Sequence, residues 1–323
     1  EKCGLQDKIE INPMHGGQWE FNNKVIEKSQ EKCVIIATNF DFINYHLILQ
    51  DMKWNAFKSA KVIVMDEAHS YSSYHGTNVY HVIKRMKKYM KNVQFIGSSA
   101  TLENATEFFS QMFDLETKNI HYIKSSEGRK RDIHELFIMP RKYGQRKTME
   151  ILCGLCFKNK KKQLIFSNRH RDAEFLAKNV EEQNKNIRIE GEKELQNIRI
   201  AVHRGGLSES SRRQTQLAMK DGDLDVISCT PTLELGIDIG TVDVAISAFK
   251  NEYDSFIQRI GRAGRSGQTA YGICVLDPED ASCHYYSRNI DEYRCQKHYV
   301  ELNKNNQIIS KKHDEAKRAE REG

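Results

Sequence analysis

Two adjacent carboxylates follow a short apolar run in the first half of the chain. Residues 62–65 lead into Asp66, Glu67, Ala68 and His69. Two acids at the carboxyl end of a buried parallel strand predict a cation site, and Mg²⁺ suits it because this ion takes few protein carboxylates. One acid can then hold the metal while the other activates water for attack on a phosphate. The alternative is an exposed acidic turn, stabilised by the dipole of a following helix.

A second set of charged groups lies near residue 260. Gln258, Arg262 and Arg265 stand at positions i, i+4 and i+7, so they share one face of an expected helix. Two glycines interrupt this stretch, and each costs about 1 kcal/mol relative to alanine inside a helix. Two arginines and an amide on one face suit the charge of a triphosphate. The alternative is a solvated helix face.

Small polar or basic groups follow other apolar runs. Ser99 and Thr101 follow residues 93–97, where they can relay a hydrogen bond from the acidic site or simply cap a helix. In the second half, three runs end in groups that suit a phosphate backbone: Asn168, then His203 with Arg204, then Thr230 before a loop that contains Gly236 and Asp238. Each of these alone could be an ordinary capped turn.

The elements that must position these groups alternate along the chain. Apolar runs at 33–37, 62–65 and 93–97 have strand length and lack polar alternation, which is typical of strands covered on both faces, and helical patterns separate them. This order predicts an α/β fold with parallel sheets and right-handed crossovers. Because the pattern lapses near residues 124–128 and then resumes, we expect domains at 1–127 and 128–285, with a polar helical extension over 286–323.

Bulk properties agree with a soluble two-domain protein. The chain has 323 residues, 29% of them charged, and a net charge of +6, which is compatible with a phosphate-bearing partner. No apolar run approaches the length of a membrane span. The eight cysteines are scattered, which indicates a reducing compartment. Cys153 and Cys156 have metal-ligand spacing, but their apolar neighbours favour a place in the core.

In order, these motifs resemble those of superfamily 2 helicases of the DEAH type. Residues 66–69 resemble motif II, 99–101 motif III, 165–168 motif IV, 230–238 motif V and 258–265 motif VI, while Thr38 and Asn39 resemble motif Ib. Trp54, Tyr71 and Gly76 are similar to features of the MrfA and Lhr-like group. The resemblance implies two RecA-like domains in tandem, the first incomplete at its N-terminus.

That resemblance also implies roles for single residues. Asp66 would hold Mg²⁺, Glu67 would activate water, and His69, Ser99 and Thr101 would couple hydrolysis to domain movement. Gln258, Arg262 and Arg265 would reach the γ-phosphate of ATP, with Gly236 and Asp238 near the nucleotide sugar and metal. The residues implied in contact with nucleic-acid phosphates are Thr38, Asn39, Asn168, His203, Arg204 and Thr230.

The implied activity is ATP-driven movement along nucleic acid. The group consists mostly of DNA helicases, often linked to repair, that move 3′ to 5′. We therefore expect single-stranded DNA or a partial duplex as partner, no membrane, and a location in the cytoplasm, nucleoid or nucleus. An RNA helicase and a non-catalytic nucleic-acid-binding module are the alternatives. Because no GxxxxGK(S/T) pattern occurs in the 323 residues, we expect the activity in a longer parent protein and not in these residues alone.

Overall fold

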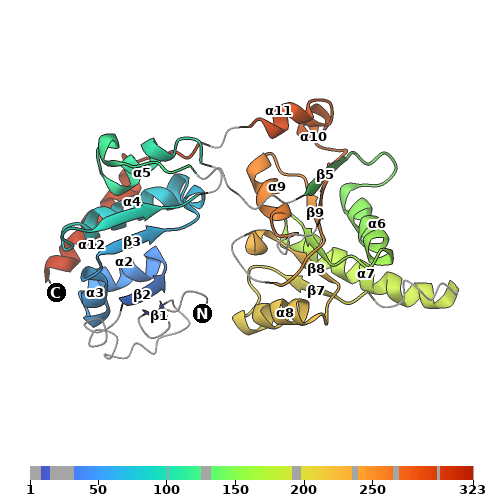
Figure 1. Ribbon diagram of the computed structural model, residues 1–323, viewed down its shortest axis with the longest axis horizontal. Coiled ribbons are helices and arrows are strands. Elements are labelled where there is room, and N and C mark those ends of the chain that lie inside the picture. The colour runs from blue at the N-terminus through green and yellow to red at the C-terminus, as the bar shows by residue number, and fades with distance from the viewer. Residues whose placement is uncertain are drawn as a thin grey trace. The chain divides into compact units, whose positions relative to one another are not determined.

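The computed structural model describes residues 9–14, 33–99, 102–124, 132–190, 198–234, 239–264, 269–296 and 299–322. The chain divides into two compact units, one of residues 1–124 with 297–323 and the other of residues 125–296 (Figure 1). Strands and helices alternate in both, and every described strand pair is parallel. The α/β prediction is therefore confirmed.

The first unit contains two parallel strand pairs, β1 with β2 and β3 with β4. Val62 lies opposite Gln94 in the second pair, so β3 and β4 end side by side. Its described elements are β1 (Ile9–Met14), β2 (Cys33–Thr38), α2 (Phe40–Leu49), α3 (Met52–Lys58), β3 (Val62–Met65), η1 (Ala68–Ser70), α4 (Ser73–Met86), β4 (Gln94–Gly97), α5 (Ala105–Phe113), η2 (Thr117–Asn119) and α12 (Gln307–Glu322).

Helices α2 to α5 bury the apolar core of the first unit. Asp51 begins α3 by accepting hydrogen bonds from the backbone N–H groups of Lys53 and Trp54, which satisfies donors that a helix start leaves open. Trp54 is then completely buried. The core lies between these helices and one side of the strands, and its members include Leu47, Trp54, Met65, Val79, Ile83, Phe108 and Met112.

The other side of these strands differs from the sequence expectation. We expected burial on both faces, but exposure alternates along β2, β3 and β4. Ile35 is 46% exposed, Val64 61% and Ile96 43%. The described helices of this unit thus cover one face of the strands, and apolar composition alone did not reveal that.

The second unit is built on a six-stranded sheet in the order β5-β10-β9-β6-β8-β7. Since all its strands are parallel, their carboxyl ends share one edge. The described elements are β5 (Ile133–Ile138), α6 (Gln145–Lys158), β6 (Gln163–Phe166), α7 (His170–Glu190), β7 (Ile200–His203), α8 (Glu209–Asp221), β8 (Val226–Cys229), η4 (Pro231–Leu233), β9 (Val244–Ala248), α9 (Tyr253–Ile260), β10 (Ala270–Val275), α10 (Ala281–Tyr286) and α11 (Ile290–Arg294).

Helices cover both faces of this sheet. On one face α6 and α7 pack through residues that include Cys153 and Leu176. On the other, α8, α9, α10 and α11 pack through residues that include Met219, Phe256 and Tyr293. Burial raises the pKa of the Cys153 thiol to about 12, so this cysteine behaves as an apolar core residue.

The C-terminal segment is divided between the units. We expected a separate extension over residues 286–323, but α11 belongs to the second unit and α12 to the first. α12 packs on α4 through a buried ion pair between Glu320 and Arg85, and His313 hydrogen-bonds Asn78 at 2.9 Å. A charged sequence therefore forms a docked helix, because part of its charge is paired in the interior.

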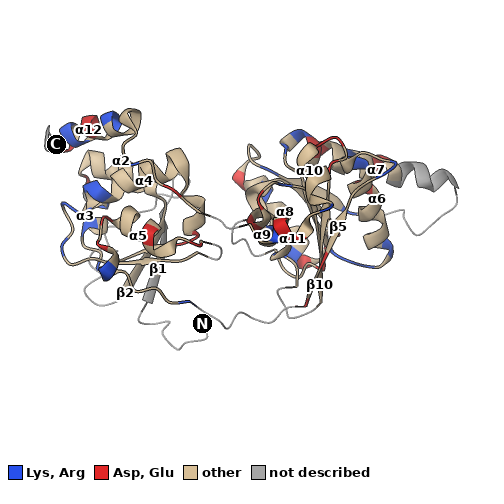
Figure 2. Cartoon of the chain, turned by 90° about the horizontal axis from the view of Figure 1, so that it is seen from above, with Lys and Arg blue, Asp and Glu red and all other residues tan. Residues whose placement is uncertain are grey.

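Charge is spread over both units. Lys and Arg lie on several elements, α3 and α12 among them (Figure 2). Among the described residues, no helix is long and apolar enough to cross a membrane.

Candidate functional site

The two acids lie where the sequence placed them, directly after β3 in the first unit. Asp66 is exposed, and its Oδ1 accepts a hydrogen bond from the Ser98 hydroxyl at the end of β4. The backbone joins the same two segments, because the N–H of Ala68 donates to the carbonyl of Ser98 at 2.8 Å. Residues 66–70, the acid turn, are thereby fixed to the neighbouring strand end.

Glu67 has a left-handed backbone conformation, with φ 49° and ψ 48°. A residue other than glycine pays about 1 kcal/mol or more for it, and such strain concentrates at functional sites. His69 follows it and is only 9% exposed. Its Nδ1 lies 3.6 Å from Glu67 Oε2 and 3.2 Å from Ser99 Oγ. The structure therefore brings together His69 and Ser99, while Thr101 lies outside the described residues.

Tyr71 and Gly76 pack behind the acid turn. A Cβ atom on Gly76 would stand 2.1 Å from the carbonyl oxygen of Tyr71, so only glycine allows α4 to approach this closely. The pKa of Tyr71 is raised, first by burial and then by the negative charges of Asp66 and Asp41. The negative charge of Asp66 therefore acts on the neighbouring Tyr71 hydroxyl.

The donor set at the acid turn suits Mg²⁺. Among the described residues, no group of three or more His, Cys, Asp or Glu gathers as a closed metal cage. Mg²⁺ is usually held by one or two carboxylates, with water and substrate phosphates as the other ligands. Asp66 and Glu67 provide such a pair in an exposed or half-exposed position.

At the end of β2, the two predicted nucleic-acid contacts have different surroundings. Asn39 begins α2, and its Oδ1 accepts the N–H of Phe42 at 2.8 Å. The Thr38 hydroxyl is buried and has no hydrogen-bond partner within the described parts of the chain. An unsatisfied hydroxyl at a strand end is costly unless a ligand completes it.

The second unit brings its predicted contacts to one edge, because β6, β8 and β7 are neighbours. Asn168 follows β6, Thr230 follows β8, and Arg204 follows β7. Arg204 bonds Glu174 on α7 through Nε at 2.7 Å. The Thr230 hydroxyl resembles that of Thr38, since it is buried and none of the described residues bonds to it.

His203 differs from the direct contact that we expected. It is 1% exposed, and burial, followed by the charge of Arg212, lowers its pKa. Nε2 faces the amide nitrogen of Gln216 at 2.9 Å, so Nε2 accepts and the Nδ1–H donates to Thr232 Oγ1 at 2.9 Å. The neutral ring supports the turn after β8 from inside the protein.

The predicted arginine helix is shorter than expected. α9 ends at Ile260, so Arg262 lies in the turn that follows and does not share a helical face with Gln258. The reason is local: Gly261 caps the helix, and Gly264 has a φ of +69°, which leaves the helical region. We call residues 258–264 the arginine segment. Arg265, Gly236 and Asp238 lie outside the described residues.

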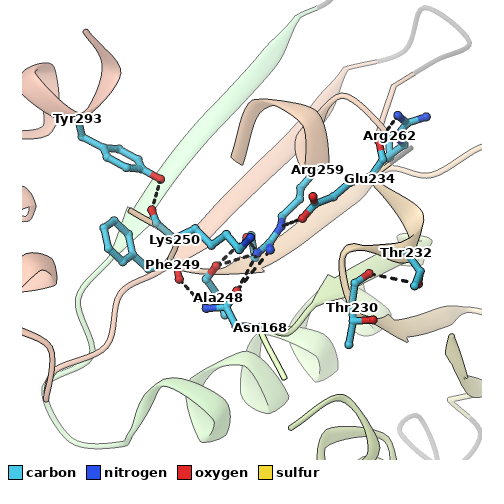
Figure 3. Close-up of polar contacts among 11 residues, drawn as sticks. Asn168, Thr230, Thr232, Glu234, Ala248, Phe249, Lys250, Arg259, Arg262 and Tyr293 are labelled. Atoms are coloured by element: carbon cyan, nitrogen blue, oxygen red, sulfur yellow. Dashed lines mark hydrogen bonds and ion pairs between the residues drawn. The ribbon is translucent and has the colours of Figure 1, made fainter. Parts of the chain in front are cut away.

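Arg262 is buried and points back to the loop after β8. Its Nη2 donates to the backbone carbonyl of Glu234, while the side chain of Glu234 bonds Arg259 (Figure 3). Two arginines of the arginine segment therefore hold one residue of the loop that carries Thr230.

Sequence reasoning missed three residues of this arrangement: Ser98, Glu234 and Arg259. Arg259 could have been found from the pattern of α9, because it lies one turn after Phe256 and next to Ile260, both buried. A charged group on an apolar helix face needs buried partners. Ser98 lies in the same hydroxyl-rich turn as Ser99, but the pattern did not single it out as the partner of Asp66. Glu234 gave no comparable signal.

Comparison with known families agrees with this geometry. Residues 6–108 match the DEAD/DEAH box helicase family, and residues 147–267 match the helicase conserved C-terminal domain. The two matches follow each other in the order of the two units. The chain belongs to the DEAD/DEAH-box helicases of superfamily 2. The acid turn lies in the first matched region and the whole arginine segment in the second.

Several helicases share sequence with this helicase chain. It is 28% identical over 297 residues to an uncharacterized ATP-dependent helicase of Methanocaldococcus jannaschii. The aligned region covers 88% of this chain and 41% of that protein. It is 32% identical over 266 residues to the ATP-dependent helicase HRQ1 of Saccharomyces cerevisiae, covering 78% of this chain and 24% of that protein. The chain thus spans less than half the length of either relative.

Solved helicase structures share the fold. The DUF1998 helicase MrfA bound to DNA superposes with a TM-score of 0.79 at 23% identity, covering 97% of this chain and 42% of that one. MrfA bound to DNA and AMPPNP gives a TM-score of 0.77, with 97% and 44% covered. Dbp5 of S. cerevisiae bound to RNA and ADP BeF3 gives 0.61 at 17% identity, with 97% and 74% covered. At these identities the likeness is one of fold.

Proposed function

We propose that the full-length protein is an ATP-dependent DNA helicase or translocase that moves 3′ to 5′ and acts in DNA repair. The observation that carries the proposal is the acid turn, where Asp66, Glu67 and the His69–Ser99 hydrogen bond meet at the ends of two parallel strands. Ends of parallel strands are where nucleotides bind in such sheets. The family to which the chain belongs and the ATP-dependent relatives support the same activity.

In this proposal the residues of the first unit prepare hydrolysis. Asp66 holds Mg²⁺, which when bound neutralises charge on the triphosphate. Glu67 takes a proton from the attacking water. His69 stands between Glu67 and Ser99, so a change at the carboxylate shifts the end of β4 through the imidazole. Thr101 takes part in the same relay.

In this proposal, residues of the second unit stabilise the charge that develops on the γ-phosphate and contact the nucleic-acid strand. Arg262, Arg265 and Gln258 stabilise the γ-phosphate in the transition state, and Gly236 and Asp238 are assigned a role in ATP binding. Thr38, Asn39, Asn168, Arg204 and Thr230 contact strand phosphates, while His203 holds the Thr232 turn in place. Phosphate contacts position a nucleic acid and do not read its sequence.

DNA is favoured over RNA because MrfA, which superposes on this chain with a TM-score of 0.79, is bound to DNA. The partner is then single-stranded DNA or a partial duplex, and the protein works in the cytoplasm, at the nucleoid or in the nucleus.

ATP hydrolysis by the full-length gene product tests the proposal. We expect single-stranded DNA to stimulate hydrolysis strongly and RNA to do so weakly, and Glu67→Gln to abolish it while DNA is still bound. Glu116→Gln is the matched control, since Glu116 is a 68% exposed side chain of the same unit. Stimulation by RNA alone would make the protein an RNA helicase, and binding without hydrolysis would make it a nucleic-acid-binding module.

A further inference from the structure

Arg259 is buried completely, although it carries a permanent charge. It lies on the inner face of α9, between Phe256 and Ile260. A buried guanidinium is stable only when its donors find partners. Its position in the second unit therefore depends on what surrounds it.

Three separate segments meet at this guanidinium (Figure 3). Nε donates to Glu234 Oε1 at 2.7 Å, in the loop after β8. Nη1 donates to Ser247 Oγ at 2.8 Å and to the carbonyl of Ala248 at 3.1 Å, at the end of β9. Both Nη atoms lie 3.3 Å from Asn168 Oδ1, directly after β6. Arg259 thus joins the ends of three strands.

The chemistry of the site requires arginine. Only a guanidinium offers five N–H groups in a fixed plane, and it also stacks on aromatic rings. Here its central carbon lies 5.5 Å from the ring centre of Phe166. A lysine ammonium would keep the charge beside Glu234 but could not reach the three segments in one plane.

The partners of Arg259 lead to both proposed ligands. Glu234 is held a second time through its carbonyl by Arg262, the residue proposed to face the triphosphate. Asn168 uses its amide nitrogen to hold the carbonyl of Phe249 at 2.8 Å, and it is proposed to contact the nucleic acid. One buried group therefore fixes residues of the nucleotide side and of the nucleic-acid side.

We propose that Arg259 is a positioning residue that couples the nucleotide response of the second unit to its grip on DNA. The inference rests on the proposed function, since it assigns a link between two sites of the same motor. A displacement of the arginine segment would reach Asn168 and Thr230 through Arg259 and Glu234. Arg259 itself touches neither ligand.

The main variant is the double substitution Arg259→Met with Glu234→Gln. It removes both charges of the pair, so no buried charge is left unpaired, and the fold should persist. In the full-length protein we expect DNA-stimulated hydrolysis to fall about 10- to 100-fold, as small misplacements at an active site do. The half-saturating concentrations of ATP and of single-stranded DNA should both rise. Arg259→Lys should change hydrolysis and both half-saturating concentrations in the same direction but by less. If the double variant does not fold, Arg259→Lys is the variant that tests the inference.

Three single variants distinguish loss of coupling between the nucleotide and DNA sites from damage to one of those sites alone. Arg262→Gln should lower turnover without changing half-saturation by DNA, whereas Arg204→Gln should raise half-saturation by DNA alone. Arg199→Gln breaks an exposed ion pair with Asp225 just before β7, at the opposite edge of the sheet, and should change neither quantity.

Two results would overturn the inference, and they differ in meaning. If the double variant folds and keeps both half-saturations and full stimulation by DNA, Arg259 is a core residue only, and the proposed function stands. If the unmodified protein shows no hydrolysis stimulated by DNA, the proposed function fails and the coupling role fails with it.

Discussion

Removal of the Glu320 carboxylate should destabilise the first unit strongly. Arg85 beneath it is 0% exposed. It donates to Glu320 Oε1 from Nε at 2.5 Å, to Asn44 Oδ1 at 2.6 Å and to His313 Nδ1 at 2.9 Å. Glu320→Ala leaves the guanidinium buried without its counter-charge.

The size of the effect follows from the remaining partners. Breaking a buried ion pair on one side costs about 3–5 kcal/mol. Because Arg85 keeps two neutral partners, we expect the lower end, about 3 kcal/mol. With a urea m-value of about 2 kcal/mol/M, the midpoint of unfolding should fall by about 1.5 M.

Tryptophan fluorescence during urea unfolding measures this change in one unit. Both tryptophans, Trp19 and Trp54, belong to the first unit. Trp54 is buried and stands edge-on to Tyr89 at 5.7 Å, and the Tyr89 hydroxyl donates to Glu320 Oε2 at 3.2 Å. Asp314→Asn on the exposed side of the same helix is the control and should leave the midpoint unchanged. Equal midpoints for the two variants would refute the role given to the buried pair.

Three further predictions concern pH, packing and coupling. Burial, followed by the charge of Arg85, lowers the pKa of His313 from 6.5 to about 3. As the pH falls, the unfolded chain therefore binds this proton before the folded chain does, so the contribution of His313 to stability is fully present above about pH 6.5 and is lost toward pH 3. The free energy of unfolding should depend less steeply on pH in His313→Asn. Gly76→Ala should cost about 1–3 kcal/mol because its Cβ would meet the Tyr71 carbonyl, and an unchanged melting temperature would contradict this. Ser99→Ala removes the hydroxyl partner of His69 and leaves Glu67 in place, so it should reduce strand separation more than hydrolysis. An equal loss of both would argue against a relay.

The elements of the fold were largely predictable because their local patterns are strong. Residues 33–37, 62–65 and 93–97 were expected as strands, and the structure has β2, β3 and β4 there. The ends of helices and strands were predicted less accurately where a single residue, such as a glycine, changes the backbone conformation. The sequence predicted a helix face through Gln258, Arg262 and Arg265, but α9 stops at Ile260 because Gly261 and Gly264 follow.

The place of Asp66 and Glu67 at a strand end was predictable from the sequence, whereas the contacts between the candidate site residues were less so. Two acids directly after a predicted strand indicate a cation site, and Asp66 and Glu67 gave that prediction from sequence alone. The pairing of Arg259 with Glu234 joins positions 25 residues apart, and it depends on how strands are ordered in the sheet. Likewise, residues 286–323 were expected as a polar helical extension, because the sequence separation of Glu320 and Arg85 conceals their pairing.

Strand displacement by the full-length protein shows whether ATP hydrolysis at the acid turn drives movement along DNA. The substrate is a DNA partial duplex with a single-stranded tail at either its 3′ or its 5′ end, with Mg²⁺ and ATP present. We expect ATP-dependent separation of the duplex with the 3′ tail, and no separation with Glu67→Gln. Displacement that needs no ATP, or that persists in Glu67→Gln, would contradict the claim that the acid turn after β3 drives a DNA motor.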